Sequence, residues 1–237
     1  MEPNDRQMIL RKLNALVESL PVVLSYVEKA SNIFGLGKNE TLQLTLATEE
    51  IFVYLCKYVC PGAAINIECF NGIYYIKVSF RFSASALNLS GLNITATISF
   101  ERESALEEMG LIIATRFVDR LKIIKGNHNE IDLTIIKEKM YPKGLKQEII
   151  NPQSMENFTL EEPDSEMLKI LALMVEKYCQ GVRKPTFFKY PGKIADMVAS
   201  GEYQAFVALN ERKEIGGGIL FSQRNETWSF ASALPKK

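Results

Sequence analysis

Residues 42–60, with the sequence LQLTLATEEIFVYLCKYVC, form the longest strongly apolar segment of the chain. Pro61 and Gly62 follow directly and are typical of the end of a helix. Beyond Glu50 the segment is apolar on nearly every side, and a helix of this kind lies inside a domain rather than on its surface. Because burial of an unpaired carboxylate is costly, Glu50 needs either a partner or a chemical role.

The overall composition is that of an ordinary globular protein, with 47% hydrophobic and 24% charged residues. The formal net charge of zero argues against binding to nucleic acid or to an anionic membrane surface, because such binding depends mostly on Lys and Arg facing phosphates. The chain has no run of about 18 apolar residues, so we expect no transmembrane helix. The polar N-terminus does not resemble a signal peptide, and we therefore expect a cytoplasmic protein with reduced thiols.

Metal ligands are scarce in the sequence. Cys56 and Cys60 lie one helical turn apart, but His128 is the only histidine and is far away along the chain. The two cysteines are therefore expected to be core residues, and we expect no metal site built from them. The same scarcity of histidine gives histidine-based catalytic triads little support.

The hydrophobic pattern of the first half predicts alternating strands and helices. We expect helices at 18–34, 38–60 and 104–119, and strands at 6–13, 63–70, 73–82, 120–124 and 130–137. The pair Asn71-Gly72 is typical of a short β-hairpin connection. Residues 1–138 are therefore expected to form an α+β domain, a two-layer sandwich in which helices cover one face of a mixed sheet.

The second half differs in composition and predicts a smaller α/β unit. Residues 139–157 contain two prolines, a glycine and many polar residues, which is typical of a linker. Within the second unit, residues 158–237, we expect a strand at 158–163, helices at 165–179 and 189–201, and strands at 203–209, 214–222 and 227–234. The triple glycine 216–218 indicates a bulge or close packing within its strand.

Leu44, Ala47 and Glu50 are spaced as L-x-x-A-x-x-E, and Tyr54 follows one turn later. This spacing, together with the order of the expected elements over residues 6–138, resembles the GHKL (histidine-kinase-like) ATPase domain of Bergerat type. The resemblance is strongest to the small bacterial anti-sigma factors that act as serine-protein kinases. That family has an asparagine at the position of Tyr54. The resemblance implies that Glu50 is the catalytic general base and that residue 54 would hold the magnesium ion of ATP. The two positions share one helix face, but a phenol is a poor ligand for a hard cation.

Two further family motifs are only partly present. D-x-G-x-G-F-D corresponds to residues 82–88, in which Phe82 replaces the aspartate that would bind adenine and alanines replace both glycines. G-x-G-L-G-L corresponds to residues 106–111, in which only the last glycine and leucine remain. The resemblance thus implies a mostly degenerate nucleotide pocket at Tyr54, Phe82, Ala84, Ala86, Gly110 and Leu111. Gly110 would mark either the start of a phosphate-binding helix or a simple packing site.

Two interpretations of Glu50 follow. Either the carboxylate still serves phosphoryl transfer, or it pairs with Tyr54 or a nearby backbone group in a filled pocket. A kinase needs metal, phosphate and base together, so we favour a pseudo-enzyme: a regulatory protein that acts by protein–protein contact, with weak or no ATP binding. By resemblance its partner would be a sigma factor or a STAS-domain antagonist, and its role the regulation of transcription. The alternative is an active serine-protein kinase that uses Mg-ATP.

Residues 158–221 resemble the front half of a GNAT acetyltransferase. In that family a later R/Q-x-x-G-x-G/A loop holds the pyrophosphate of acetyl-CoA with its backbone amides. The sequence ends at residues 233–237, ALPKK, where this loop would begin, so we expect no binding of acetyl-CoA. One further hypothesis is therefore a fragment of a two-domain acetyltransferase. An unfinished sheet edge in this unit would favour a homodimer or a partner strand.

Overall fold

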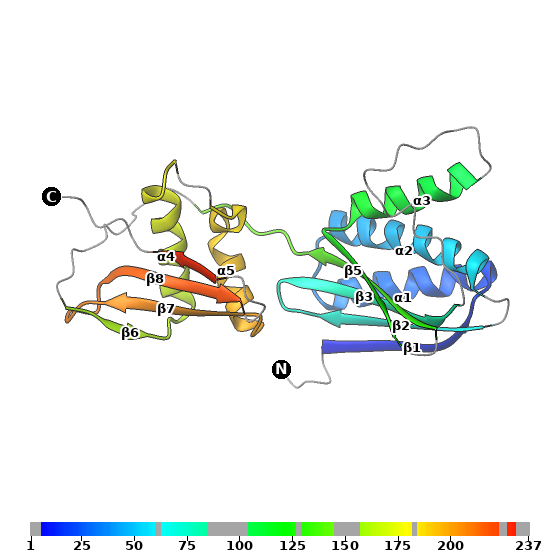
Figure 1. Ribbon diagram of the computed structural model, residues 1–237, viewed down its shortest axis with the longest axis horizontal. Helices are drawn as coiled ribbons and strands as arrows, with labels where there is room; N and C mark the ends of the chain where they lie inside the picture. The colour runs from blue at the N-terminus through cyan, green and yellow to red at the C-terminus, as the bar shows by residue number, and fades with distance from the viewer. Residues whose placement is uncertain are drawn as a thin grey trace. The chain divides into compact units, whose positions relative to one another are not determined.

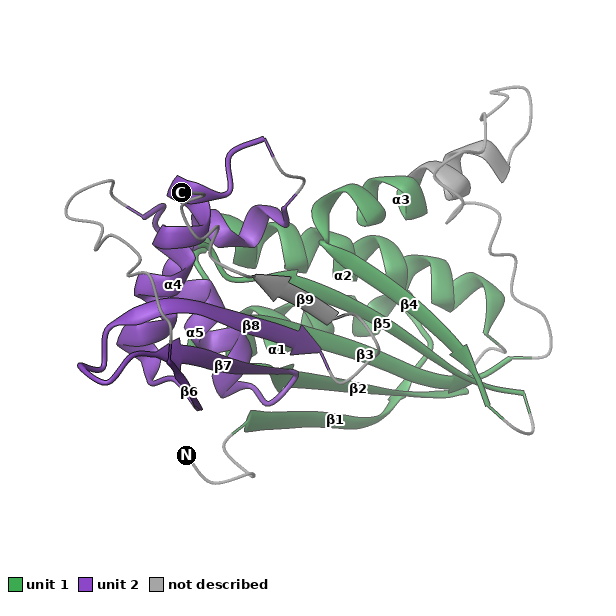
Figure 2. Ribbon diagram, turned by 60° about the vertical axis from the view of Figure 1, so that its left-hand side comes forward, with its two compact units in different colours: residues 1–140 green, residues 141–237 purple. Residues whose placement is uncertain are grey.

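The computed structural model describes residues 6–59, 63–84, 104–126, 129–144, 157–181, 184–222 and 227–230. The chain divides into two compact units, residues 1–140 and 141–237 (Figure 2). The division falls inside the stretch expected to be a linker, of which residues 145–156 lie outside the described part.

The first unit is a five-stranded sheet with three α-helices. Its elements in chain order are β1 (Gln7–Asn14), the 3-10 turn η2 (Val17–Ser19), α1 (Leu20–Ile33), α2 (Lys38–Tyr58), β2 (Ala64–Asn71), β3 (Tyr75–Ser83), α3 (Ser104–Phe117), β4 (Arg120–Lys125) and β5 (Glu130–Glu138). The strand order is β1-β2-β3-β5-β4. The α+β class is confirmed.

The expected mixed sheet is wrong, because all four neighbouring strand pairs of this sheet are antiparallel. The connection from β3 through α3 to β4 does produce two parallel strands. However, β5 turns back from β4 and pairs between them, so the two parallel strands never become neighbours.

Helices α1, α2 and α3 lie together on one face of the sheet (Figure 1). The central helix α2 packs against both of the others. Its side toward the sheet is a completely buried apolar stripe formed by Leu44, Ala47, Ile51 and Leu55. The apolar positions of β3, which alternate with polar ones, complete the same core. The hydrophobic pattern of α2 and β3 therefore agrees with the sides of these two elements that are buried, whereas Val22 and Ile33 of α1 are exposed although they are apolar.

The hairpin between β2 and β3 is present, but its connection is longer than the Asn71-Gly72 pair indicates. β2 ends at Asn71 and β3 begins at Tyr75, so three residues, 72–74, make the connection. Ile73 has a φ angle of 70°, and its backbone N–H donates to Asn71 Oδ1 at 3.1 Å. The guanidinium of Arg120 lies 5.1 Å from the ring centre of Tyr75. The turn is nevertheless tight, because the backbone N–H of Gly72 donates to the carbonyl oxygen of Tyr75 at 2.9 Å.

The second unit is a smaller antiparallel sheet with two α-helices. Its elements are β6 (Thr159–Glu161), α4 (Ser165–Tyr178), the 3-10 turn η4 (Thr186–Lys189), α5 (Pro191–Ala199), β7 (Tyr203–Leu209), β8 (Ile215–Ser222) and β9 (Thr227–Phe230). The strand order is β6-β7-β8-β9, which places β9 at one edge. Asp164 caps α4 by accepting from the N–H of Met167 at 2.8 Å.

The triple glycine has both of its expected roles. The pairing of β7 with β8 moves from Ala208–Gly217 to Leu209–Ile215, which leaves Gly216 as the extra residue of a bulge. Gly218 is a close-packing position, because a Cβ there would lie 2.6 Å from Leu171 Cδ2.

None of the helices in the described part of the chain is long and apolar enough to cross a membrane.

Candidate functional site

Glu50 lies on the side of α2 that faces α3. Its side chain is partly exposed, and its carboxylate lies against Gly110, where a Cβ would overlap Oε2. The structure therefore brings together two residues that the sequence separates by 60 positions. A glycine at position 110 leaves room for this carboxylate between the two packed helices.

Gly110 is not at the start of a helix. It is the seventh residue of α3, which begins at Ser104, so its N–H is not one of the unpaired donors of a helix N-terminus. The expectation of a phosphate-binding helix start at Gly110 is therefore wrong. The alternative, a packing glycine, is confirmed by its contact with Glu50.

Tyr54 follows Glu50 by one turn and is buried, with 5% of its surface exposed. Its ring centre lies 4.4 Å from that of Tyr58, so the two aromatic side chains pack together along α2. The ring is part of the hydrophobic core of the first unit. A bulky phenol thus fills the position at which the resemblance would require a magnesium ligand.

The remaining described positions of the expected nucleotide pocket are also buried. Phe82 is 5%, Ala84 8% and Leu111 1% exposed, and all three belong to the same core as Tyr54. The backbone N–H of Ala84 donates to the carbonyl oxygen of Asn129 at 3.1 Å. Ala86 lies outside the described residues. The structure therefore buries these side chains in the core of the first unit, and Phe82 in addition lines a cavity of about 340 Å³ together with Arg81 and Ile124.

No group of three or more His, Cys, Asp or Glu side chains that could hold a metal ion occurs among the described residues. His128 lies outside that part of the chain. Cys69 is completely buried, and burial raises the pKa of its thiol to about 12, as expected for a core cysteine. Within the described part of the chain, Glu50 is thus a carboxylate at a helix–helix contact and belongs to no such group.

The substitution of Gly110 by alanine tests how closely Glu50 packs there. Alanine is favoured over glycine in a helix interior by about 1 kcal/mol. In the otherwise unchanged protein we expect less than about half of that gain, because the new methyl group displaces the Glu50 carboxylate. In a Glu50→Ala background the full gain should return. A double-mutant cycle measured by urea unfolding checks this, and equal gains in both backgrounds would contradict the packing.

Charged residues that the sequence did not single out gather on the face of the first sheet that points away from the three helices, which we term the outer face. Arg81 Nε donates to Asp132 Oδ2 at 3.0 Å, and Arg81 Nη1 lies 3.3 Å from Glu68 Oε2. The hydrogen bond to Asp132 raises the pKa of Arg81. Ser79 and Thr134 extend the network through a 2.9 Å hydrogen bond between their hydroxyls. The alternation of β3 predicted that Arg81 points outward, but the strand register decided its partners.

No family model matches this chain, and no curated protein matches it.

Proposed function

We propose that the first unit is a regulatory module that acts by protein–protein contact, as a degenerate relative of the GHKL-type anti-sigma factors, and that it binds ATP weakly or not at all. The observation that supports this most is the burial of Tyr54, Phe82 and Leu111, which are at most 5% exposed. Side chains that fill a core leave no volume for an adenine ring or a hydrated magnesium ion.

The presence of a carboxylate at Glu50 supports a relationship to the GHKL-type proteins, but it does not support phosphoryl transfer by this chain. Phosphoryl transfer needs the base, the metal and the phosphate-binding backbone at one place. Here the base lies against Gly110 inside a helix, and the position of the magnesium ligand, one turn along α2, is held by a buried tyrosine. By the same resemblance, the partner is a sigma factor or a STAS-domain antagonist.

For the second unit we propose a GNAT-like fold. A strand followed by two helices and then by an antiparallel run of three strands supports it, since this is the order of elements on which the resemblance rests. The acetyl-CoA loop has no counterpart among the described residues, so the proposal concerns the fold and not an acetyl transfer.

Isothermal titration of the full chain with Mg-ATP, and separately with Mg-ADP, tests the proposed function. We expect no saturable heat at micromolar nucleotide, because the pocket positions are filled. A micromolar dissociation constant would overturn the pseudo-enzyme proposal and favour an active kinase. In that case Glu50→Gln, which keeps the size of the side chain but removes the base, should retain nucleotide binding and abolish phosphate transfer to the partner protein.

A further inference from the structure

Strand β1 contains a bulge that places two neighbouring cations beside one cavity. The register of β1 with β2 shifts between Leu10 and Leu13, and Lys12 has a left-handed φ angle of 55°. Its backbone N–H donates to Asn66 Oδ1 at 3.0 Å, which holds the bulge. Consecutive residues of a regular strand point to opposite faces. Because of the bulge, Arg11 and Lys12 instead line the same cavity of about 500 Å³.

The cavity has an excess of positive charge. Arg11, Lys12 and Arg81 line it together with Glu68. Arg81 pairs with both Glu68 and Asp132, so the excess of one positive charge comes from Arg11 and Lys12. This excess is local, because the whole chain has a net charge of zero. The ion pairs with Glu68 and Asp132 hold the Arg81 guanidinium in place, although the side chain is 54% exposed. An orientation fixed in advance reduces the entropy lost on binding.

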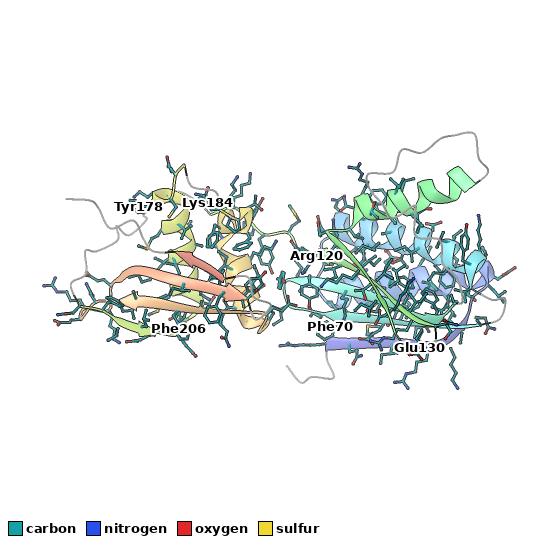
Figure 3. The ribbon with its side chains drawn as sticks, in the orientation of Figure 1. Phe70, Arg120, Glu130, Tyr178, Lys184 and Phe206 are labelled. Carbon is teal, nitrogen blue, oxygen red and sulfur yellow. The ribbon has the colours of Figure 1, made fainter. Side chains whose placement is uncertain are left out.

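Exposed apolar side chains lie on the strands at both edges of the outer face. Ile9 of β1 is 42% exposed and lines the basic cavity. Ile124 of β4 is 63% exposed and lines a second cavity of about 340 Å³, at the end of the sheet where Glu130 is labelled in Figure 3. Glu130 and Asp132 also line this second cavity, so the positive charge lies at the β1 end of the surface and not at the β4 end. The two cavities share Arg81 and Asn66.

The length of this surface favours a peptide over a small anion. Four strand spacings of about 4.8 Å separate the two edge strands, or about 19 Å in total. An extended segment of about six residues, at about 3.3 Å per residue, covers that distance. A single phosphate or carboxylate ion would contact only the centre of the outer face. An arginine between apolar contacts is also typical of the energetically dominant residues of a protein interface.

We propose that the outer face binds an extended acidic segment of a partner protein. Its carboxylates lie over Arg11 and Lys12 at the β1 end, and its apolar side chains contact Ile9 and Ile124. The proposal rests on the proposed function only in that a regulatory protein needs a docking surface. It concerns peptide binding and not nucleotide binding, so each proposal can fail while the other stands.

Fluorescence anisotropy of a labelled peptide of alternating glutamate and leucine, titrated with the full chain at low salt, tests this inference. The double variant Arg11→Gln/Lys12→Gln should weaken binding by about tenfold or more. The matched control Lys29→Gln/Lys38→Gln removes the same charge from exposed positions of α1 and α2 and should bind as the unchanged protein does. Arg11→Lys, which keeps the charge, should retain most of the affinity.

Three outcomes would overturn the inference. One is the absence of saturable binding by the unchanged protein. A second is an equal loss in both double variants, which would indicate non-directional attraction. The third is increased self-association of Arg11→Gln/Lys12→Gln with unchanged peptide binding. That result would show that the bulge and its cations only protect an edge strand from pairing.

Discussion

Replacement of Phe82 by aspartate should lower the free energy of unfolding by at least about 4 kcal/mol. Aspartate is the residue that an ATP-binding relative would have at this position. Here the side chain is 5% exposed and packs in the core beneath α2 and α3. The substitution removes a large apolar side chain and places a carboxylate in its volume, and both changes destabilise the folded state. Urea unfolding followed by circular dichroism measures the loss.

Phe82→Leu is the matched control for this experiment. It keeps an apolar side chain at the same position, so the loss should be no more than about 1.5 kcal/mol. An aspartate variant that is as stable as the leucine variant, and that binds Mg-ATP, would show that position 82 lines an open pocket. That result would contradict the packed core and the proposed function together.

Gly218→Val should destabilise the second unit by about 3 kcal/mol. A Cβ at position 218 would lie 2.9 Å from the carbonyl oxygen of Phe206 as well as 2.6 Å from Leu171 Cδ2. The leucine side chain can move, but the carbonyl belongs to the neighbouring strand β7 and cannot move without disturbing the ladder. Trp228, the only tryptophan, belongs to this unit, so its fluorescence can follow the unfolding.

Gly192→Ala supplies the control within the same unit. A Cβ at position 192 would lie 3.4 Å from Tyr141 Cδ1, an ordinary contact, and the residue is in α5. We expect a change of less than about 1 kcal/mol, in the direction of greater stability. A valine at 218 that is tolerated as well as this alanine would show that β8 does not pack closely against α4.

The sequence alone was sufficient to predict the type and the order of most of the described helices and strands. Periodicity reports which side of a helix or strand is buried, and it does so locally. The alternation in β3 and the apolar character of residues 42–60 therefore predicted the core correctly. The triple glycine was also interpretable from the sequence, since a residue without a Cβ is required where a bulge or a close approach occurs.

The contacts between distant segments were decided only by the tertiary structure. The sequence singled out both Glu50 and Gly110, but it did not show that the carboxylate packs on this glycine in the interior of α3. Nor did it show that β5 would pair between β3 and β4, which makes the sheet antiparallel and sets Asp132 beside Arg81. Strand register and helix–helix contacts depend on residues far apart in the chain, and no local pattern specifies them. The helix with Glu50 and its burial were evident from 19 consecutive residues, whereas the contact of Glu50 with Gly110 emerged only from the packing of α2 on α3.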